Sequence, residues 1–224
     1  MTELIFMLTH HDVTISNAIQ VFENEVKGTH LKYIGCKDIS LPLAELKELF
    51  RKMKKERLTT FLEVVSYDEN KHFEGIDKAI AIGADYIIGG MPWLAEKTAD
   101  YLAKKKANIK FFPYIGKIVD HPCILEGTIK EIVDNGLEFE KKGMKGFNVL
   151  LYRYTGNVNH LLDEVTAKLS VPIVYAGSVD SYARIEQLKS KNVFAFTIGG
   201  AILEFKFAQE KSVRSQIEAV LKQL

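Results

Sequence analysis

Short apolar stretches alternate along the chain with amphipathic ones, and this alternation is the main structural signal in the sequence. The apolar stretches, rich in β-branched and aromatic residues, predict strands at 4–9, 31–36, 59–65, 85–89, 109–113, 146–151, 172–176 and 193–198. Helical periodicity between them predicts helices at about 16–26, 43–55, 69–82, 93–105, 128–142, 157–169, 182–189 and 212–224. The clearest helix is 43–55, where one apolar stripe is formed by Leu43, Leu46, Leu49, Phe50 and Met53.

These eight strand–helix units predict a parallel sheet covered by helices. No linker rich in Pro, Gly or Ser interrupts them, so we expect residues 1–224 to form one compact α/β domain, a (β/α)₈ TIM barrel. An open, doubly wound sheet is the alternative, but the glycine fingerprint of a Rossmann-type sheet is missing after the first strand. The connection 114–127 is the exception among short loops, and its length suits a lid.

Composition and charge narrow the functional classes. The 30 basic and 29 acidic residues give a formal net charge of +1, and the lysines are scattered along helices, so we expect no nucleic-acid partner. Cys36 and Cys123 are far apart and fit no metal spacing, which favours a reduced, cytoplasmic protein. We expect no metal and no other cofactor. The apolar run 4–8 is too short for a signal peptide or a membrane span. A monomer and a homodimer are both compatible with the sequence.

Two glycine-containing segments follow the last two predicted strands. Gly177-Ser178 comes after strand 172–176, and Gly199-Gly200 comes after strand 193–198, just before a short helix expected to begin near Ala201. In a barrel both segments lie at the carboxyl-terminal face, where functional groups gather. Uncovered backbone N–H groups and the positive end of the short helix predict a cradle for a phosphate dianion. Two tight turns without a ligand are the structural alternative.

The segment YAGSVDSYARIEQLKSKNVFAFTIGGAIL, residues 175–203, resembles the phosphate-binding end of triosephosphate isomerase and is similar to that of histidine-biosynthesis isomerases. The resemblance implies that Gly177, Ser178, Gly199 and Gly200 bind phosphate. It does not imply the isomerase chemistry, because the segments LTHHD, GGMPW and LLYRYTG lack that family's lysine, histidine and glutamate. The chain is also similar to short bacterial sequences named 4-hydroxythreonine-4-phosphate dehydrogenase, although it has no nicotinamide site or metal triad.

Lys37 and Glu63 are the strongest candidates for the chemistry. Because side chains alternate along a strand, Glu63 shares a face with Phe61 and Val65 in an apolar strand, where an unpaired carboxylate would be costly. Lys37 on the neighbouring strand is the natural partner. The segment GCKDIS also looks like the surroundings of the Schiff-base lysine in pyruvate-type aldolases, although on a different strand. We expect desolvation to lower the pKa of Lys37, which would make it a base or an imine-forming nucleophile; a structural ion pair is the alternative.

Further candidates lie in the loops that follow other strands. His10, His11 and Asp12 follow the first strand, and on an extended strand end only one of the two histidines would face the site. Asp12 or His10 would supply a second acid–base group, unless Asp12 caps a helix. Lys117 and His121 would close over the substrate from the long connection, or be solvated. Arg153 would clamp a carboxylate or a second phosphate, or form a surface salt bridge.

Together these features predict a barrel that binds a small phosphorylated metabolite of the sugar-phosphate kind. The predicted activity is that of an isomerase, an epimerase or an aldolase-type lyase, through proton abstraction next to a carbonyl. A barrel that senses a phosphorylated metabolite without catalysis, like the antiterminator barrels of glycerol operons, is the alternative.

Overall fold

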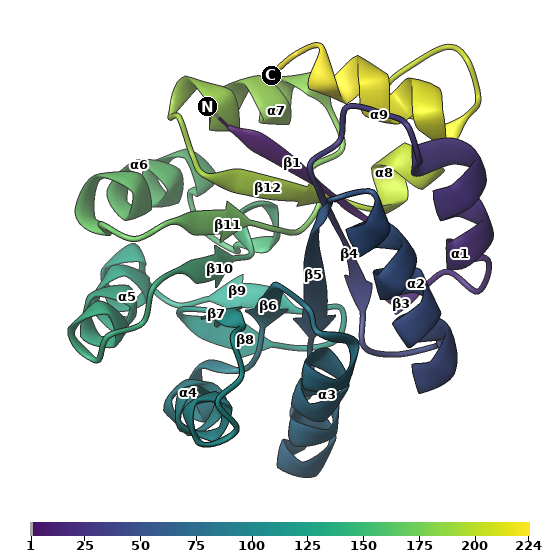
Figure 1. Ribbon diagram of the computed structural model, residues 1–224. Coiled ribbons are helices and arrows are strands. Elements are labelled where there is room, and N and C mark those ends of the chain that lie inside the picture. Colours follow the sequence, from purple (N-terminus) through teal and green to yellow (C-terminus); the bar gives the residue numbers. More distant parts are fainter. Residues whose placement is uncertain (1) are drawn as a thin grey trace.

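Eight parallel strands form one sheet in the computed structural model, which describes residues 2–224 (Figure 1). A parallel bridge between Tyr114 and Asn148 joins the two edges, where the Asn148 N–H donates to the Pro113 carbonyl at 2.8 Å. The sheet is therefore a nearly closed barrel, and the predicted (β/α)₈ fold is confirmed.

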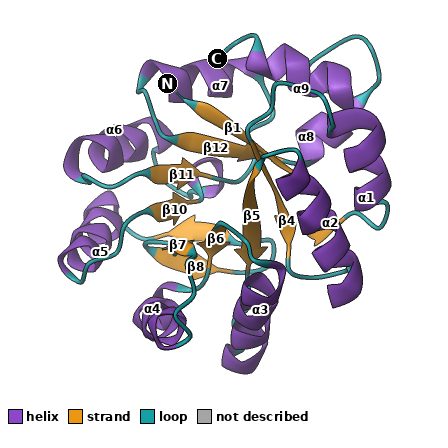
Figure 2. Cartoon of the chain, in the orientation of Figure 1, coloured by secondary structure: helices purple, strands orange, loops and turns teal. Residues whose placement is uncertain are grey.

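The predicted strands and helices all have counterparts in the structure, with bounds that differ by a few residues. The barrel strands are β1 (Glu3–Met7), β4 (Tyr33–Lys37), β5 (Thr59–Val64), β6 (Tyr86–Gly89), β7 (Lys110–Phe112), β10 (Phe147–Val149), β11 (Ile173–Tyr175) and β12 (Ala195–Ile198). Their order in the sheet is β10-β11-β12-β1-β4-β5-β6-β7. The helices around them (Figure 2) are α1 (Ala18–Val21) with the π-helical turn η1 (Phe22–Val26), α2 (Leu43–Lys55), α3 (Glu69–Ile82), η2 (Pro92–Leu94) with α4 (Ala95–Lys104), α5 (Ile129–Lys141), η3 (Leu151–Arg153) with α6 (Val158–Lys168), α7 (Tyr182–Ser190), α8 (Gly200–Leu203) and α9 (Val213–Leu221).

Local sequence signals explain where these helices form. In α2 the side chains of Leu46, Leu49, Phe50 and Met53 are buried against the barrel, as the apolar stripe predicts, whereas Leu43 at the first turn is exposed. Helix α5 begins at a capping box, in which Thr128 and Glu131 satisfy each other's backbone N–H groups. These helices are therefore determined by short-range pattern together with packing on the sheet.

The interior of the barrel is apolar at mid-height and polar at one end. Its buried cluster consists of Ile5, Met7, Phe61, Tyr86, Ile88, Phe112, Val174 and Ala195. Glu63 lies two residues beyond Phe61 on β5, paired in register with Lys37 of β4. The alternation of strand side chains thus brings Glu63 and Lys37 to the carboxyl-terminal end of the barrel interior, beyond this apolar cluster.

Two antiparallel hairpins at the carboxyl-terminal face were not predicted. The first pairs β2 (Thr9–His10) with β3 (Val13–Thr14), so the predicted strand 4–9 is wrong beyond Met7. The second pairs β8 (Lys117–Val119) with β9 (Ile124–Glu126) inside the predicted long loop. Buried side chains and a bridge from Leu125 to Tyr154 fix this second hairpin against the barrel. The connection 114–127 is therefore a structured cover of the barrel mouth.

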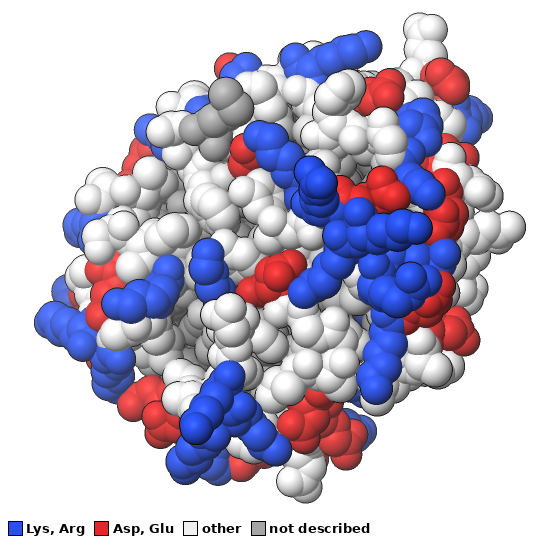
Figure 3. Space-filling model, viewed as in Figure 1, with Lys and Arg blue, Asp and Glu red and all other residues white. Residues whose placement is uncertain are grey.

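Charged side chains of both signs are interspersed on the visible surface (Figure 3). Basic residues gather over α2, and some of them are paired with acidic ones: Lys52 contacts Glu23 at 2.6 Å, and Arg51 contacts Glu48 at 2.9 Å. Among the described residues, no helix is both long enough and apolar enough to cross a bilayer.

Candidate active site

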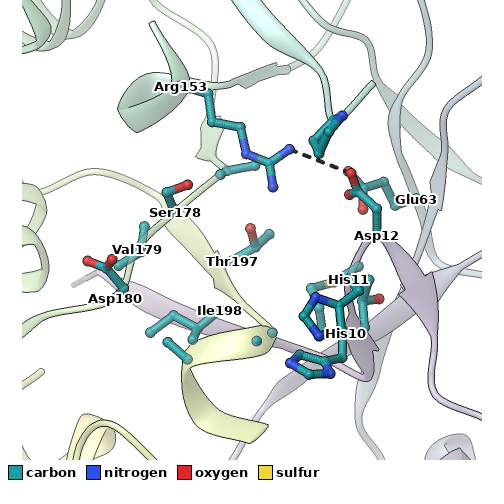
Figure 4. A pocket seen from close by; sticks show the side chains of 18 of the residues that line it. His10, His11, Asp12, Glu63, Arg153, Ser178, Val179, Asp180, Thr197 and Ile198 are labelled. Carbon is teal, nitrogen blue, oxygen red and sulfur yellow. Dashed lines mark ion pairs between the residues drawn. The ribbon is translucent and has the colours of Figure 1, made fainter. Parts of the chain in front are cut away.

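A cavity of about 470 Å³ opens at the carboxyl-terminal ends of the strands. It brings together residues from widely separated segments: the β2–β3 hairpin, the ends of β4 and β5, and the segments after β10, β11 and β12. Figure 4 shows Arg153 reaching from the region near Ser178 toward Asp12 and Glu63, with His10 and His11 at another edge of the same space. This is the position at which barrel enzymes carry their active sites.

Lys37 lies at the centre of a buried charged cluster. Its Nζ donates to Asp12 Oδ1 at 2.7 Å and lies 3.9 Å from Glu63 Oε2. Tyr114, which is fully buried, donates its hydroxyl to Glu63 Oε1 at 3.0 Å. Thr14 fixes the backbone of Lys37, because its hydroxyl donates to the Lys37 carbonyl and accepts from the Lys37 N–H. The ammonium group is therefore held between two carboxylates, and Tyr114 positions that of Glu63.

This cluster changes the expected protonation of Lys37. Burial by itself would lower the pKa of the Lys37 ammonium, but the charges of Glu63 and Asp12 outweigh burial and raise that pKa above its ordinary value. Burial alone would raise the pKa of the Asp12 carboxyl, but Lys37, assisted by Arg153 and His121, holds that pKa below its ordinary value. The expectation of a lowered lysine pKa was wrong, because it counted desolvation without the second carboxylate.

At neutral pH the resting site therefore holds an ammonium group at Lys37 and a carboxylate at Asp12. The ammonium can donate to a carbonyl oxygen, and the carboxylate can accept a proton from carbon. Imine formation would first require Lys37 to pass its proton to a neighbouring base, because only the neutral amine is a nucleophile.

The histidines after β1 adopt a geometry that an extended strand end does not provide. His11 and Asp12 form the turn of the β2–β3 hairpin, with φ values of 47° and 64°. The rings of His10 and His11 lie 3.8 Å apart, and both residues line the cavity, so the prediction that only one faces the site was wrong. His10 contacts Glu204 at 3.0 Å. Asp12 caps no helix, since α1 has Asn17 at its N-cap.

The two glycine loops meet at one side of the cavity. Gly177, Ser178, Gly199 and Gly200 all line it. In the part of the chain that the structure describes, the N–H groups of Gly177, Ser178 and Gly200 donate to no protein acceptor. Gly177 also makes room for Arg153, because a Cβ atom there would lie 3.0 Å from Arg153 Cγ. The loops thus combine uncovered amides with a neighbouring guanidinium, which is a suitable environment for an anion.

Gly199 is required for a close backbone approach, and this gives a first prediction. A Cβ atom at Gly199 would lie 2.5 Å from the Thr9 carbonyl oxygen, a backbone atom that cannot move aside. We expect Gly199→Ala to lower the free energy of unfolding by about 1–3 kcal/mol, as overpacking does, and to weaken phosphate binding. Urea unfolding and calorimetric titration with inorganic phosphate measure the two effects.

The adjacent glycine provides the matched control. At Gly200 the nearest atom to a Cβ would be His10 Cδ2, at an ordinary 3.5 Å. Gly200→Ala should therefore leave stability within about 0.5 kcal/mol of the unmodified protein. Equal losses in the two variants would contradict the close-approach explanation.

The two candidates in the β8–β9 hairpin lie in different environments. Lys117 does not line the cavity; its Nζ pairs with Glu126 at 2.8 Å and its side chain is 67% exposed. His121 is exposed at the hairpin turn, near enough to Asp12 for its charge to lower the pKa of that carboxyl. The structure therefore brings His121 near the charged cluster and leaves Lys117 outside the cavity.

Some residues of the site were not predicted from the sequence. Tyr114 could have been predicted as a site residue, because it lies two residues after Phe112, whose side chain faces the barrel interior. Glu204 and Lys206, which line the cavity after α8, carried no recognisable signal. Among the described residues, no group of three or more His, Cys, Asp and Glu side chains is arranged to hold a metal ion.

Comparisons with known proteins agree with the fold. The sequence matches no family model and no curated protein. Among solved structures, thiamine phosphate pyrophosphorylase from Pyrococcus furiosus is similar with a TM-score of 0.61 and 15% identity, over 99% of this chain and 96% of that one. N-acetylmannosamine-6-phosphate 2-epimerase from Clostridium perfringens has a TM-score of 0.64 and 13% identity, over 98% and 92%. The YdjI aldolase from Escherichia coli K12 has a TM-score of 0.63 and 15% identity, over 99% and 89%.

At these identities the likeness concerns the fold. The expected resemblance to phosphate-binding barrels is supported at the level of architecture. The resemblance to 4-hydroxythreonine-4-phosphate dehydrogenases receives no support.

Proposed function

We propose that this protein binds a small sugar phosphate at the mouth of the barrel and moves a proton on the carbon next to a carbonyl, as an isomerase, epimerase or aldolase-type lyase. The observation that carries the proposal is the position of the Asp12–Lys37–Glu63 cluster in the same cavity as the two glycine loops. Two of the structurally similar proteins, an epimerase and an aldolase, have names that agree with this class of chemistry.

In the proposed reaction the phosphate occupies the loops of Gly177–Ser178 and Gly199–Gly200. Asp12 removes a proton from the carbon next to the carbonyl, and the electron pair of that C–H bond forms a C=C bond. The carbonyl oxygen receives the displaced electron pair and takes a proton from the Lys37 ammonium, giving an enol. Asp12 then returns its proton to a different carbon or face of the enol, while Lys37 takes a proton back from the enol hydroxyl, so that a C=O bond re-forms. This gives the isomer or epimer and restores both residues.

Supporting roles follow from the contacts. Glu63, fixed by Tyr114, keeps Lys37 in position, and Arg153 and His121 favour the ionised form of Asp12. His10, which contacts Glu204 beside Gly200, is placed to assist on the phosphate side. Lys117 receives no role in this scheme because of its distance from the cavity.

The proposal is tested in two steps. A thermal-shift screen of phosphorylated sugars identifies ligands, since a ligand at 100 times its Kd stabilises the fold by about 2.7 kcal/mol. Proton NMR in D₂O then follows exchange of the hydrogen next to the carbonyl of the best ligand. Binding with protein-dependent exchange is the expected result. Binding without exchange would favour the sensing barrel, and no stabilisation by any phosphorylated sugar would contradict both.

A further inference from the structure

Arg153 and Asp12 face each other in the cavity without forming a hydrogen bond. Arg153 Nη1 lies 4.0 Å from Asp12 Oδ2, beyond hydrogen-bonding distance. Asp12 Oδ2 is a buried acceptor with no hydrogen-bond partner among the described residues, whereas Oδ1 of the same carboxylate is bound to Lys37. An unpartnered, buried carboxylate oxygen is energetically costly, so a ligand group that donates a hydrogen bond to Oδ2 would bind favourably there.

Most N–H donors of the Arg153 guanidinium also have no protein acceptor among the described residues. It carries five N–H donors, and its one hydrogen bond in the described part of the chain is a long contact of 3.5 Å from Nη1 to the Cys123 carbonyl. Its side chain is 30% exposed and lines the cavity, while its stem passes over Gly177. The donors of Arg153 are thus available to a ligand that occupies the cavity.

Together these two groups present an acceptor on one side of the gap and donors on the other. A hydroxyl group satisfies both, because its O–H donates to Asp12 Oδ2 while its lone pairs accept from Arg153. A carboxylate does not, since it has no proton to donate and would face the ionised Asp12 at close range. With 4.0 Å between Nη1 and Oδ2, a single oxygen atom can lie within hydrogen-bonding distance of both.

We infer that Asp12 and Arg153 form a subsite that recognises one hydroxyl group of the ligand and discriminates against a carboxylate at that position. The inference rests on the proposed function and makes its substrate more specific. Lys37 donates on the Oδ1 side of Asp12, so a carbonyl oxygen bound by Lys37 and a hydroxyl bound at Oδ2 belong on neighbouring carbons. The ligand class is therefore a phosphorylated hydroxy-ketone or hydroxy-aldehyde, and phosphorylated keto acids are excluded.

Three small phosphate esters test the subsite by calorimetric titration. Dihydroxyacetone phosphate has a hydroxymethyl group beside its carbonyl, hydroxyacetone phosphate has a methyl group there, and 3-phosphohydroxypyruvate has a carboxylate there. We expect hydroxyacetone phosphate to bind about tenfold more weakly than dihydroxyacetone phosphate, because a hydrogen bond to charged groups is lost. 3-Phosphohydroxypyruvate should be the weakest ligand of the three.

A charge-neutral variant makes the test sharper. Asp12→Asn keeps the shape of the side chain and removes its charge, so the variant should bind dihydroxyacetone phosphate more weakly and 3-phosphohydroxypyruvate more tightly than the unmodified protein does. Gly199→Ala, which disturbs the phosphate loop, should weaken all three ligands by the same factor. Circular dichroism establishes that both variants are folded.

The possible results separate this inference from the proposed function. Equal affinities of the unmodified protein for dihydroxyacetone phosphate and hydroxyacetone phosphate would overturn the hydroxyl subsite and leave phosphate binding standing. Tighter binding of 3-phosphohydroxypyruvate than of dihydroxyacetone phosphate would have the same meaning. An unchanged ratio of affinities in Asp12→Asn would do the same. If none of the three esters and no inorganic phosphate binds, the proposed function fails, and the subsite fails with it.

Discussion

Replacing Lys37 by methionine should abolish proton exchange and leave phosphate binding intact. The ammonium group supplies the proton and the positive charge for the carbonyl oxygen, so exchange should fall by about 10²–10⁴-fold, the usual contribution of a general acid–base group. The atoms nearest to Gly177, Gly199 and Gly200 belong to residues other than Lys37, so the Kd for inorganic phosphate should change by less than about twofold. Proton NMR in D₂O with the best ligand from the thermal-shift screen measures the exchange.

The same substitution should also destabilise the fold. Lys37 is buried between Asp12 and Glu63, and removing one partner of a buried ion pair costs about 3–5 kcal/mol because the remaining charges are uncompensated. Lys37→Arg keeps the charge and serves as the second variant if Lys37→Met does not fold. It should still lose exchange, because a planar guanidinium rarely gives up its proton.

Lys117 provides the control for the Lys37 variants. It is also a lysine paired with a glutamate, but it lies outside the cavity and is mostly exposed. Lys117→Met should change stability by less than about 1 kcal/mol and leave exchange unaffected. Normal exchange in a folded Lys37→Met protein would end the proposed role of Lys37.

Replacing Asp38 by asparagine should stabilise the protein at neutral pH. Asp38 follows Lys37 and its side chain is buried beside Gly75 of α3. Burial raises the pKa of its carboxyl to about 6 from 3.8, against the opposing charge of Lys78. A carboxyl with a raised folded-state pKa favours folding at low pH and progressively disfavours it as the pH rises from about 4 to about 6.

The ionised Asp38 should therefore cost about 3 kcal/mol at pH 7. Asp38→Asn removes this cost, so its free energy of unfolding in urea should exceed that of the unmodified protein at pH 7, with the difference disappearing below about pH 4. Asp134→Asn, on an exposed helix position paired with Lys130, should show at most about 1 kcal/mol of change. A less stable Asp38→Asn protein at pH 7 would mean that the charge of Lys78 outweighs burial.

The sequence by itself determined the architecture, because the architecture depends on signals that are local. Helix α2 was predicted from its apolar stripe with its exact bounds, and the barrel strands were predicted from short apolar runs. The proximity of Lys37 and Glu63 followed from strand alternation, since a charged residue inside an apolar strand requires a partner on the neighbouring one.

The two hairpins and the electrostatics of the site were decided by tertiary structure. The β2–β3 turn depends on left-handed backbone at His11 and Asp12, residue types that do not signal such a turn as glycine does. That turn brings Asp12 to Lys37, and the added carboxylate reverses the direction of the lysine pKa shift. Asp12 and Arg153 lie 141 residues apart in the chain, and only closure of the barrel brings their side chains close together. Strand and helix patterns are set by neighbours along the chain, whereas charge balance and hydrogen-bond partners are set by neighbours in space.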